Sequence, residues 1–186
     1  RERFAQTREQ WRIQVRNGHE AGNQSLKHPC SRNFAFVMTE NCLEHYTLER
    51  MATEVAEAIR AMREGIPEQA EATYCYPCYQ DFVGVGVNRQ SYVPVIARHF
   101  PAARGWGEVP NHPRLCDLHY LWSCDAHGFD GERLIAYAEL AVPQNRWAIF
   151  AFHGVGADHL RVEADAFRAL LRHLTGQPGR FWPATA

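Results

Sequence analysis

Hydrophobic residues recur along the chain at two kinds of spacing, and segments of the two kinds alternate. Spacings of three and four residues predict helices at about 47–64, 92–100, 131–141 and 162–174, after a first helix that starts at a Thr7 capping box and ends near Gly18. Short apolar runs predict strands at 72–76, 102–104 and 147–152, the last of them buried on both faces. This alternation predicts an α/β architecture in a single domain covering residues 1–186.

Glycine and proline mark two stretches as exposed loops, at 81–88 and 105–113. Composition then narrows the class of protein. The chain has 186 residues, is 46% hydrophobic and carries a formal net charge of −1, which excludes a disordered chain and removes long-range attraction to nucleic acid. No apolar run approaches the roughly 18 residues that a transmembrane segment needs. The sequence starts at Arg1 without a signal peptide and leaves both export and the oligomeric state open.

His153 directly follows the predicted strand at 147–152 and precedes Gly154. Ligands of parallel α/β sheets bind at the carboxyl ends of strands, so a histidine there is well placed for general acid–base catalysis. The alternative is a structural histidine that hydrogen-bonds the end of the strand. From position alone the two interpretations are equal.

A polar segment at 18–30 contains Gln24 and His28, which lie four residues apart and would face the same way on one helical turn. Two histidines at this spacing would form half of a zinc site, although here the first is a glutamine and a structural histidine is the simpler interpretation. Cys75 and Cys78 have the C-x-x-C spacing of redox and zinc motifs, but structural thiols or disulfides fit better, since a glycine-rich loop follows. Three tryptophans can stack on sugars or belong to the core: Trp106, Trp122 and Trp147.

Several of these segments together resemble the polysaccharide deacetylases, the NodB-homology carbohydrate esterases. GHEAGNQSLKHP at 18–29 is similar to the second motif of that family, which reads G-H-E-x-G-N-H-[ST]-x-x-H-P. YCYPC at 74–78 looks like the third motif in the branch with F-A-Y-P-C, and the strand closed by His153 looks like the fifth. The resemblance extends over nearly the whole chain.

The resemblance implies a distorted (β/α) barrel of about seven strands and a divalent metal, zinc above all, with cobalt or nickel as substitutes. The metal would polarise an acetamide carbonyl and activate water. His28 would be a metal ligand, Gln24 would occupy the position of the second histidine ligand, and His153 would be the general acid. Tyr76 and Trp106 would contact the substrate, an acetylated oligo- or polysaccharide.

The chain departs from the family pattern in three places. The strand that ends in two adjacent aspartates is missing, which makes the barrel incomplete as given and suggests truncation at both ends. Gln24 weakens the metal site, and Cys75 replaces an arginine that orients the catalytic base. Asp117 or Asp125 would supply the fourth motif. These departures favour the alternative of a non-catalytic carbohydrate-binding relative that has lost its metal.

Cys30 and Cys78 each follow a proline at the end of a family motif, and in the implied barrel these two ends adjoin. The resemblance therefore predicts a Cys30–Cys78 disulfide. A disulfide suits a protein that is extracellular, periplasmic or on the cell surface.

Overall fold

The computed structural model describes residues 2–185, and the chain forms two compact units. The first unit contains the chain up to Gly105 together with Leu118–Tyr120, and the second contains Trp106–Asp117 and the chain from Leu121 onward. Each unit combines α-helices with short parallel strand pairs, which confirms the predicted α/β class. The deacetylase-type barrel and the single-domain organisation stay predictions.

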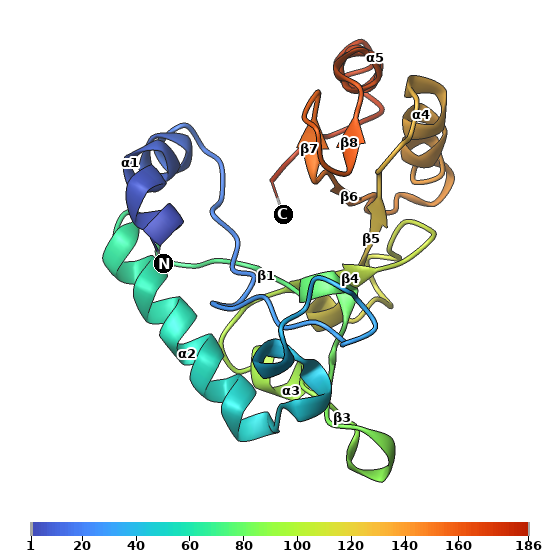
Figure 1. Ribbon diagram of the computed structural model, residues 1–186. Coiled ribbons are helices and arrows are strands. Elements are labelled where there is room, and N and C mark those ends of the chain that lie inside the picture. The colour runs from blue at the N-terminus through green and yellow to red at the C-terminus, as the bar shows by residue number, and fades with distance from the viewer. Residues whose placement is uncertain (1, 186) are drawn as a thin grey trace. The chain divides into compact units, whose positions relative to one another are not determined.

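The first unit contains the longer helices and the first four strands, labelled in Figure 1 where space allows. They are α1 (Glu2–Arg16), α2 (Leu48–Gly65), β1 (Tyr74–Cys75), β2 (Phe82–Val83), β3 (Gln90–Ser91), α3 (Val93–Ile96) and β4 (Ala103–Trp106), whose last residue belongs to the second unit. Short 3₁₀ turns connect them at Thr39–Asn41, Leu43–His45, Pro77–Tyr79, Gly86–Asn88 and Leu118–Tyr120.

Helix α2 forms where the hydrophobic pattern predicts it. Thr47 is its N-cap and accepts a hydrogen bond from the backbone N–H of Arg50 at 3.2 Å. Met51 and Val55 lie on the face that is buried in the core of the unit. Because the apolar side chains recur every three or four residues, one face of the helix is covered while the charged face remains in water.

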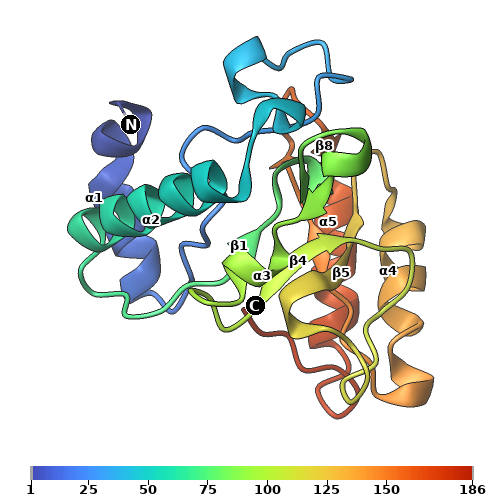
Figure 2. The ribbon, with the colours of Figure 1, turned by 90° about the horizontal axis from the view of Figure 1, so that it is seen from below.

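Helix α1 lies beside the C-terminal end of α2 in both ribbon views (Figures 1 and 2). A Cβ atom on Gly65 would come within 2.5 Å of the Phe4 ring, so the glycine allows this close approach. The helix begins at Glu2, and the prediction of a capping box at Thr7 is wrong because Thr7 lies inside the helix. Packing of Phe4 against α2 gives the additional N-terminal residues a tertiary partner that the local sequence does not reveal.

Strand β1 pairs in parallel with β4, with Tyr74 opposite Ala103 and Cys75 opposite Arg104. The predicted strands at 72–76 and 102–104 are therefore present, the first one shorter. The expected loop at 81–88 is partly wrong, because β2 pairs antiparallel with β3. Gly84 makes this tight turn possible, with φ +76 and no space for a Cβ, which would lie 2.5 Å from the Asn88 carbonyl oxygen.

The second unit consists of short strands and two helices that lie side by side in Figure 2. Its elements are β5 (Leu121–Asp125), α4 (Gly131–Glu139), a 3₁₀ turn at Val142–Gln144, β6 (Phe150–Ala151), β7 (Gly154–Val155), β8 (Arg161–Val162) and α5 (Ala164–Thr175). Leu134 of α4 and Leu170 of α5 are buried in its core. The helices predicted at 131–141 and 162–174 are confirmed, with each boundary within two residues.

Two expectations about strands of the second unit are corrected. The predicted strand at 147–152 contains only Phe150 and Ala151 in regular pairing, and Trp147 is 46% exposed, so the segment is not buried on both faces. The hydrophobic pattern also missed β5, which pairs in parallel with β6. Its sequence mixes apolar and polar residues, and the partner strand lies more than twenty residues away, so no local signal marks it.

Among residues 2–185, no helix is both long enough and apolar enough to cross a membrane.

Candidate functional site

The segment with the second-motif resemblance lies in an extended conformation beside β1. Asn23 forms an isolated parallel bridge with Tyr74, receives the Cys75 N–H on its carbonyl oxygen at 2.8 Å, and is only 2% exposed. Its side-chain oxygen accepts the backbone N–H of Ser25 at 2.9 Å and closes a local turn. The buried asparagine thus fixes the position at which the chain leaves β1 towards His28.

Gln24 and His28 do not lie on a helical turn, because residues 19–30 contain no helix. The expectation that their side chains face the same way through helical spacing is therefore wrong. Ser25 and His28 both have positive φ, 62° and 52°, and the His28 N–H donates to Ser25 Oγ at 3.1 Å. The Gln24 side chain donates instead to Cys75 Sγ at 3.6 Å, so the two atypical residues of the motifs contact each other.

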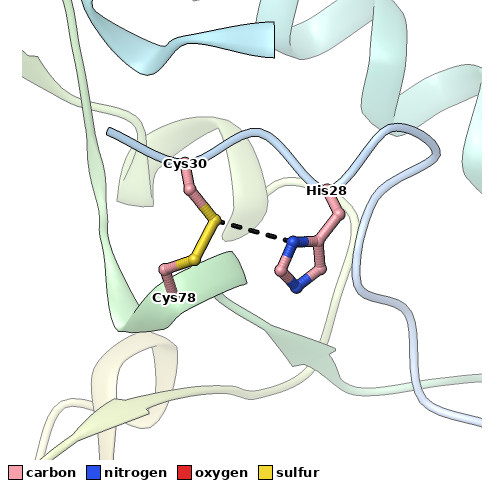
Figure 3. Close-up of side chains that lie close together, drawn as sticks. All are labelled: His28, Cys30 and Cys78. Carbon is pink, nitrogen blue, oxygen red and sulfur yellow. Dashed lines mark hydrogen bonds between the residues drawn. A yellow bond between two sulfur atoms is a disulfide. The ribbon is translucent and has the colours of Figure 1, made fainter. Parts of the chain in front are cut away.

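Cys30 and Cys78 form a disulfide with Cα atoms 5.9 Å apart, and the predicted pairing is confirmed (Figure 3). Cys30 is fully buried, whereas Cys78 is half-buried. Cys75 stays a free thiol, so the C-x-x-C pair is not a disulfide of its own. Burial raises the pKa of the Cys75 thiol, and the positive charge of Arg104 opposes this shift.

Two tyrosines, the buried Tyr92 and the partly buried Tyr120, hold the loop that carries Cys78. The hydroxyl of Tyr92 donates to the Gln80 carbonyl oxygen at 2.8 Å, and that of Tyr120 donates to the Tyr79 carbonyl oxygen at 2.9 Å. On the other side of the disulfide, the Ser31 N–H donates to Gln80 Oε1 at 2.7 Å. The two cysteine segments are therefore joined by the Ser31–Gln80 hydrogen bond in addition to the covalent bond.

His28 lies against the disulfide, with Nδ1 3.5 Å from Cys30 Sγ (Figure 3). The ligand atoms of His28, Cys30 and Cys78 all lie within 4.8 Å of one another, and these residues could hold a metal ion. Within residues 2–185, these three form the group of His, Cys, Asp or Glu side chains whose ligand atoms lie close enough together to share one metal ion. Sulfur binds metal as a thiolate, so the group has its full ligand set only when the disulfide is reduced.

Tyr76 is fully buried and does not reach a surface on which a sugar could bind. Its hydroxyl donates to the His119 carbonyl oxygen at 2.7 Å, and its ring packs against those of Tyr74, Tyr92 and Tyr120. The structure thus places this candidate for substrate binding in the core. Tyr76 follows β1 and points to the same side as the buried Tyr74, two residues before it.

His153 and Asp125 form the second cluster, within the second unit. Asp125 is the last residue of β5, His153 follows the neighbouring strand β6, and the pair of strands is parallel. His153 Nε2 lies 3.8 Å from Asp125 Oδ1, which is longer than a hydrogen bond, and about a third of each side chain is exposed. Both groups thus lie at the carboxyl ends of adjacent strands, where the sequence analysis expected a site.

Trp106 lies at the end of β4 and is 48% exposed, so an aromatic face is accessible there for stacking. Trp122 and Trp147 are exposed to a similar degree. Their backbones are joined by Asn111, a 5% exposed residue whose side-chain NH₂ donates to both of their carbonyl oxygens, at 2.7 and 3.2 Å. Sequence reasoning missed Asn111, since nothing in its neighbourhood signals a buried amide.

Comparisons of the chain with protein-family models, with curated proteins and with solved structures found no match. The geometry of the two clusters is therefore the basis of the functional proposal.

Proposed function

We propose that this protein is a hydrolase that removes N-acetyl or O-acetyl groups from a carbohydrate. One observation carries the proposal: an exposed imidazole and a carboxylate lie in contact at the carboxyl ends of the parallel strands β5 and β6. This position suits acid–base chemistry because rigid backbone holds both groups at the rim of the sheet. The resemblance of the loop at 18–30 to a deacetylase motif supplies the substrate class.

In this proposal His153 is the general acid. Asp125 contacts the imidazole at Nε2 and orients the ring, so the proton for the departing amine or alcohol would come from Nδ1. Trp106, half exposed at the end of β4, would stack on a sugar ring.

The residues described do not assemble the aspartate and two histidines that the deacetylase family uses for its metal. Gln24 at one ligand position is hydrogen-bonded to Cys75 Sγ, and the ligands gathered around His28 are disulfide sulfurs. In the family a divalent metal such as zinc, cobalt or nickel would polarise the acyl carbonyl, but its ligand set is not assembled among the described residues, so no step proposed for His153 and Asp125 passes through a metal. Metal dependence is accordingly part of what the experiment measures.

The experiment is acetate release from oligomers of N-acetylglucosamine and from an O-acetylated oligosaccharide, each without metal and with added zinc, cobalt or nickel. We expect His153→Ala to lower kcat by about 10²-fold or more, because a general acid contributes roughly 10²–10⁴-fold. Asp125→Asn should lower kcat less, since the imidazole itself remains. His159→Ala is the matched control, an exposed histidine of the same unit, and should leave activity unchanged. If no acetate is released from any of these substrates with any of these metals, the proposed hydrolase activity is refuted.

A second function is favoured by the Gln24–Cys75 contact, since Gln24 stands in place of a histidine ligand and Cys75 in place of the arginine that orients the catalytic base of the family. The chain would then be a non-catalytic carbohydrate-binding relative. Binding of the same oligosaccharides without bound metal and without turnover, measured by calorimetry, would select this function. If Trp106→Ala weakens that binding, the sugar binds at the exposed face of Trp106.

We further propose that the protein acts outside the cytosol, at the cell surface or in an extracellular or periplasmic space. The Cys30–Cys78 disulfide supports this location, because such bonds persist in oxidising compartments. It is compatible with the lack of a membrane-crossing helix among residues 2–185.

A further inference from the structure

We propose that His28, Cys30 and Cys78 form a redox-controlled zinc site, which binds Zn²⁺ when the disulfide is reduced and loses it when the disulfide forms. This inference does not depend on the proposed hydrolase activity. The three residues belong to the first unit, and their ligand atoms already lie within 4.8 Å of one another.

In the oxidised protein, the distance between one nitrogen and one sulfur ligand already matches that in a tetrahedral zinc site. Zinc–sulfur bonds of about 2.3 Å and zinc–nitrogen bonds of about 2.0–2.1 Å place neighbouring sulfur and nitrogen ligands about 3.6 Å apart. His28 Nδ1 lies 3.5 Å from Cys30 Sγ, so this pair needs no rearrangement (Figure 3). The two sulfur atoms must separate, to about 3.8 Å, which becomes possible once the bond between them is broken.

The backbone around the site is fixed by contacts that reduction does not remove. The Ser31 N–H donates to Gln80 Oε1 at 2.7 Å, and the Leu43 N–H donates to the Cys30 carbonyl oxygen at 3.0 Å. The carbonyls of Tyr79 and Gln80 accept hydrogen bonds from the hydroxyls of Tyr120 and Tyr92. Both thiols should therefore stay close together after reduction, as a preorganised ligand pair.

The redox step balances with an external thiol as the reductant. Two thiol molecules reduce the disulfide to two cysteine thiols and leave as their own disulfide, so that two electrons and two protons pass to the protein. The first thiolate attacks at the half-buried Cys78, since Cys30 is fully buried. Zinc then displaces the two thiol protons and binds both thiolates and the His28 imidazole, with water in the fourth position next to this exposed residue.

The test compares the zinc content of the full chain in its oxidised and reduced forms, after incubation with Zn²⁺ and removal of unbound metal under anaerobic conditions. We expect no bound zinc in the oxidised form and one zinc per chain in the reduced form. Titration of the reduced form with Co²⁺ should produce the near-ultraviolet absorption of cobalt–thiolate bonds. The free cysteines Cys42, Cys75, Cys116 and Cys124 are thiols in both forms, so the difference isolates the disulfide.

Variants locate the site. His28→Ala, Cys30→Ser and Cys78→Ser should each raise the zinc dissociation constant of the reduced protein by at least about tenfold, given that even indirect partners of metal ligands contribute roughly 10–100-fold. Cys116→Ser is the control and should bind zinc like the unmodified chain. Equal zinc content in both forms, or zinc retained by both cysteine variants, would overturn the proposal.

Reduction also removes a crosslink, so circular dichroism is recorded alongside. If the reduced chain unfolds without metal and regains its folded spectrum with one equivalent of zinc, the site is supported. If it neither binds zinc nor refolds on adding it, the site does not exist. These readouts are independent of acetate release and so separate this proposal from the hydrolase.

Discussion

Reduction of the Cys30–Cys78 disulfide, with a chelator present to exclude metal, should destabilise the first unit by about 4 kcal/mol. The bond joins residues 48 positions apart, and a crosslink stabilises chiefly by removing entropy from the unfolded chain. A loop of this length corresponds to about 13–14 cal/mol/K, which is about 4 kcal/mol at room temperature. Reduction removes no heavy atoms, so no cavity contributes to the change.

The native state should change little, because the Ser31 N–H to Gln80 Oε1 hydrogen bond joins the two segments independently of the sulfurs, and Tyr92 holds Gln80 in place. The loss therefore appears as a lower unfolding midpoint rather than as a different fold. Because the first unit contains about 100 residues, we expect its Tm to fall by about 16 °C, at about 4 °C per kcal/mol. In urea the midpoint should fall by roughly 2 M, for an m-value of about 2 kcal/mol/M.

The two units can be followed separately by their aromatic residues. Of the 7 tyrosines only Tyr137 lies in the second unit, so near-ultraviolet circular dichroism of tyrosine reports the first unit. Of the 5 tryptophans only Trp11 lies in the first unit, so tryptophan fluorescence reports mainly the second. On reduction, we expect the unfolding midpoint monitored by tyrosine to fall and the midpoint monitored by tryptophan to remain unchanged. The double variant Cys30→Ala/Cys78→Ala should reproduce the shift without reductant, and a loss below about 1 kcal/mol would refute the loop-entropy reasoning.

Three further predictions concern single residues. Thr47→Ala should lower the free energy of unfolding by about 1 kcal/mol in urea titrations, because α2 loses its N-cap, while Thr47→Ser should restore it. Asn111→Ala should cost about 2–4 kcal/mol in the tryptophan-monitored transition, since buried backbone groups of two segments lose their partners; a change below 0.5 kcal/mol, roughly the effect of an ordinary surface substitution, would contradict this. Burial and the negative charge of Asp125 raise the pKa of the Cys124 thiol, so its alkylation at pH 7, followed by mass spectrometry, should be at least about tenfold slower in the folded protein than in urea.

Local patterns predicted α2, α4 and α5 to within about two residues, whereas the helix expected at 92–100 contains only Val93–Ile96. The spacing of Met51 and Val55 along α2, and of Leu170 and its neighbours along α5, follows directly from which side chains can share a helical face. The start of α1 could not be predicted, because it depends on Phe4 packing against Gly65, sixty residues away. The same limit explains the missed strand β5, whose hydrogen-bond partners lie on β6.

The candidate site divides in the same way. The motif resemblance predicted that Cys30 pairs with Cys78, and the structure confirms this disulfide. The sequence also singled out His28 and His153, whose roles stay predictions. Only the tertiary structure placed Asp125 against His153, buried Tyr76 in an aromatic core and placed the His28 imidazole on the disulfide. The sequence shows which chemical groups are present. The distances between groups far apart in sequence are set by the packing of the fold and are known only from the tertiary structure.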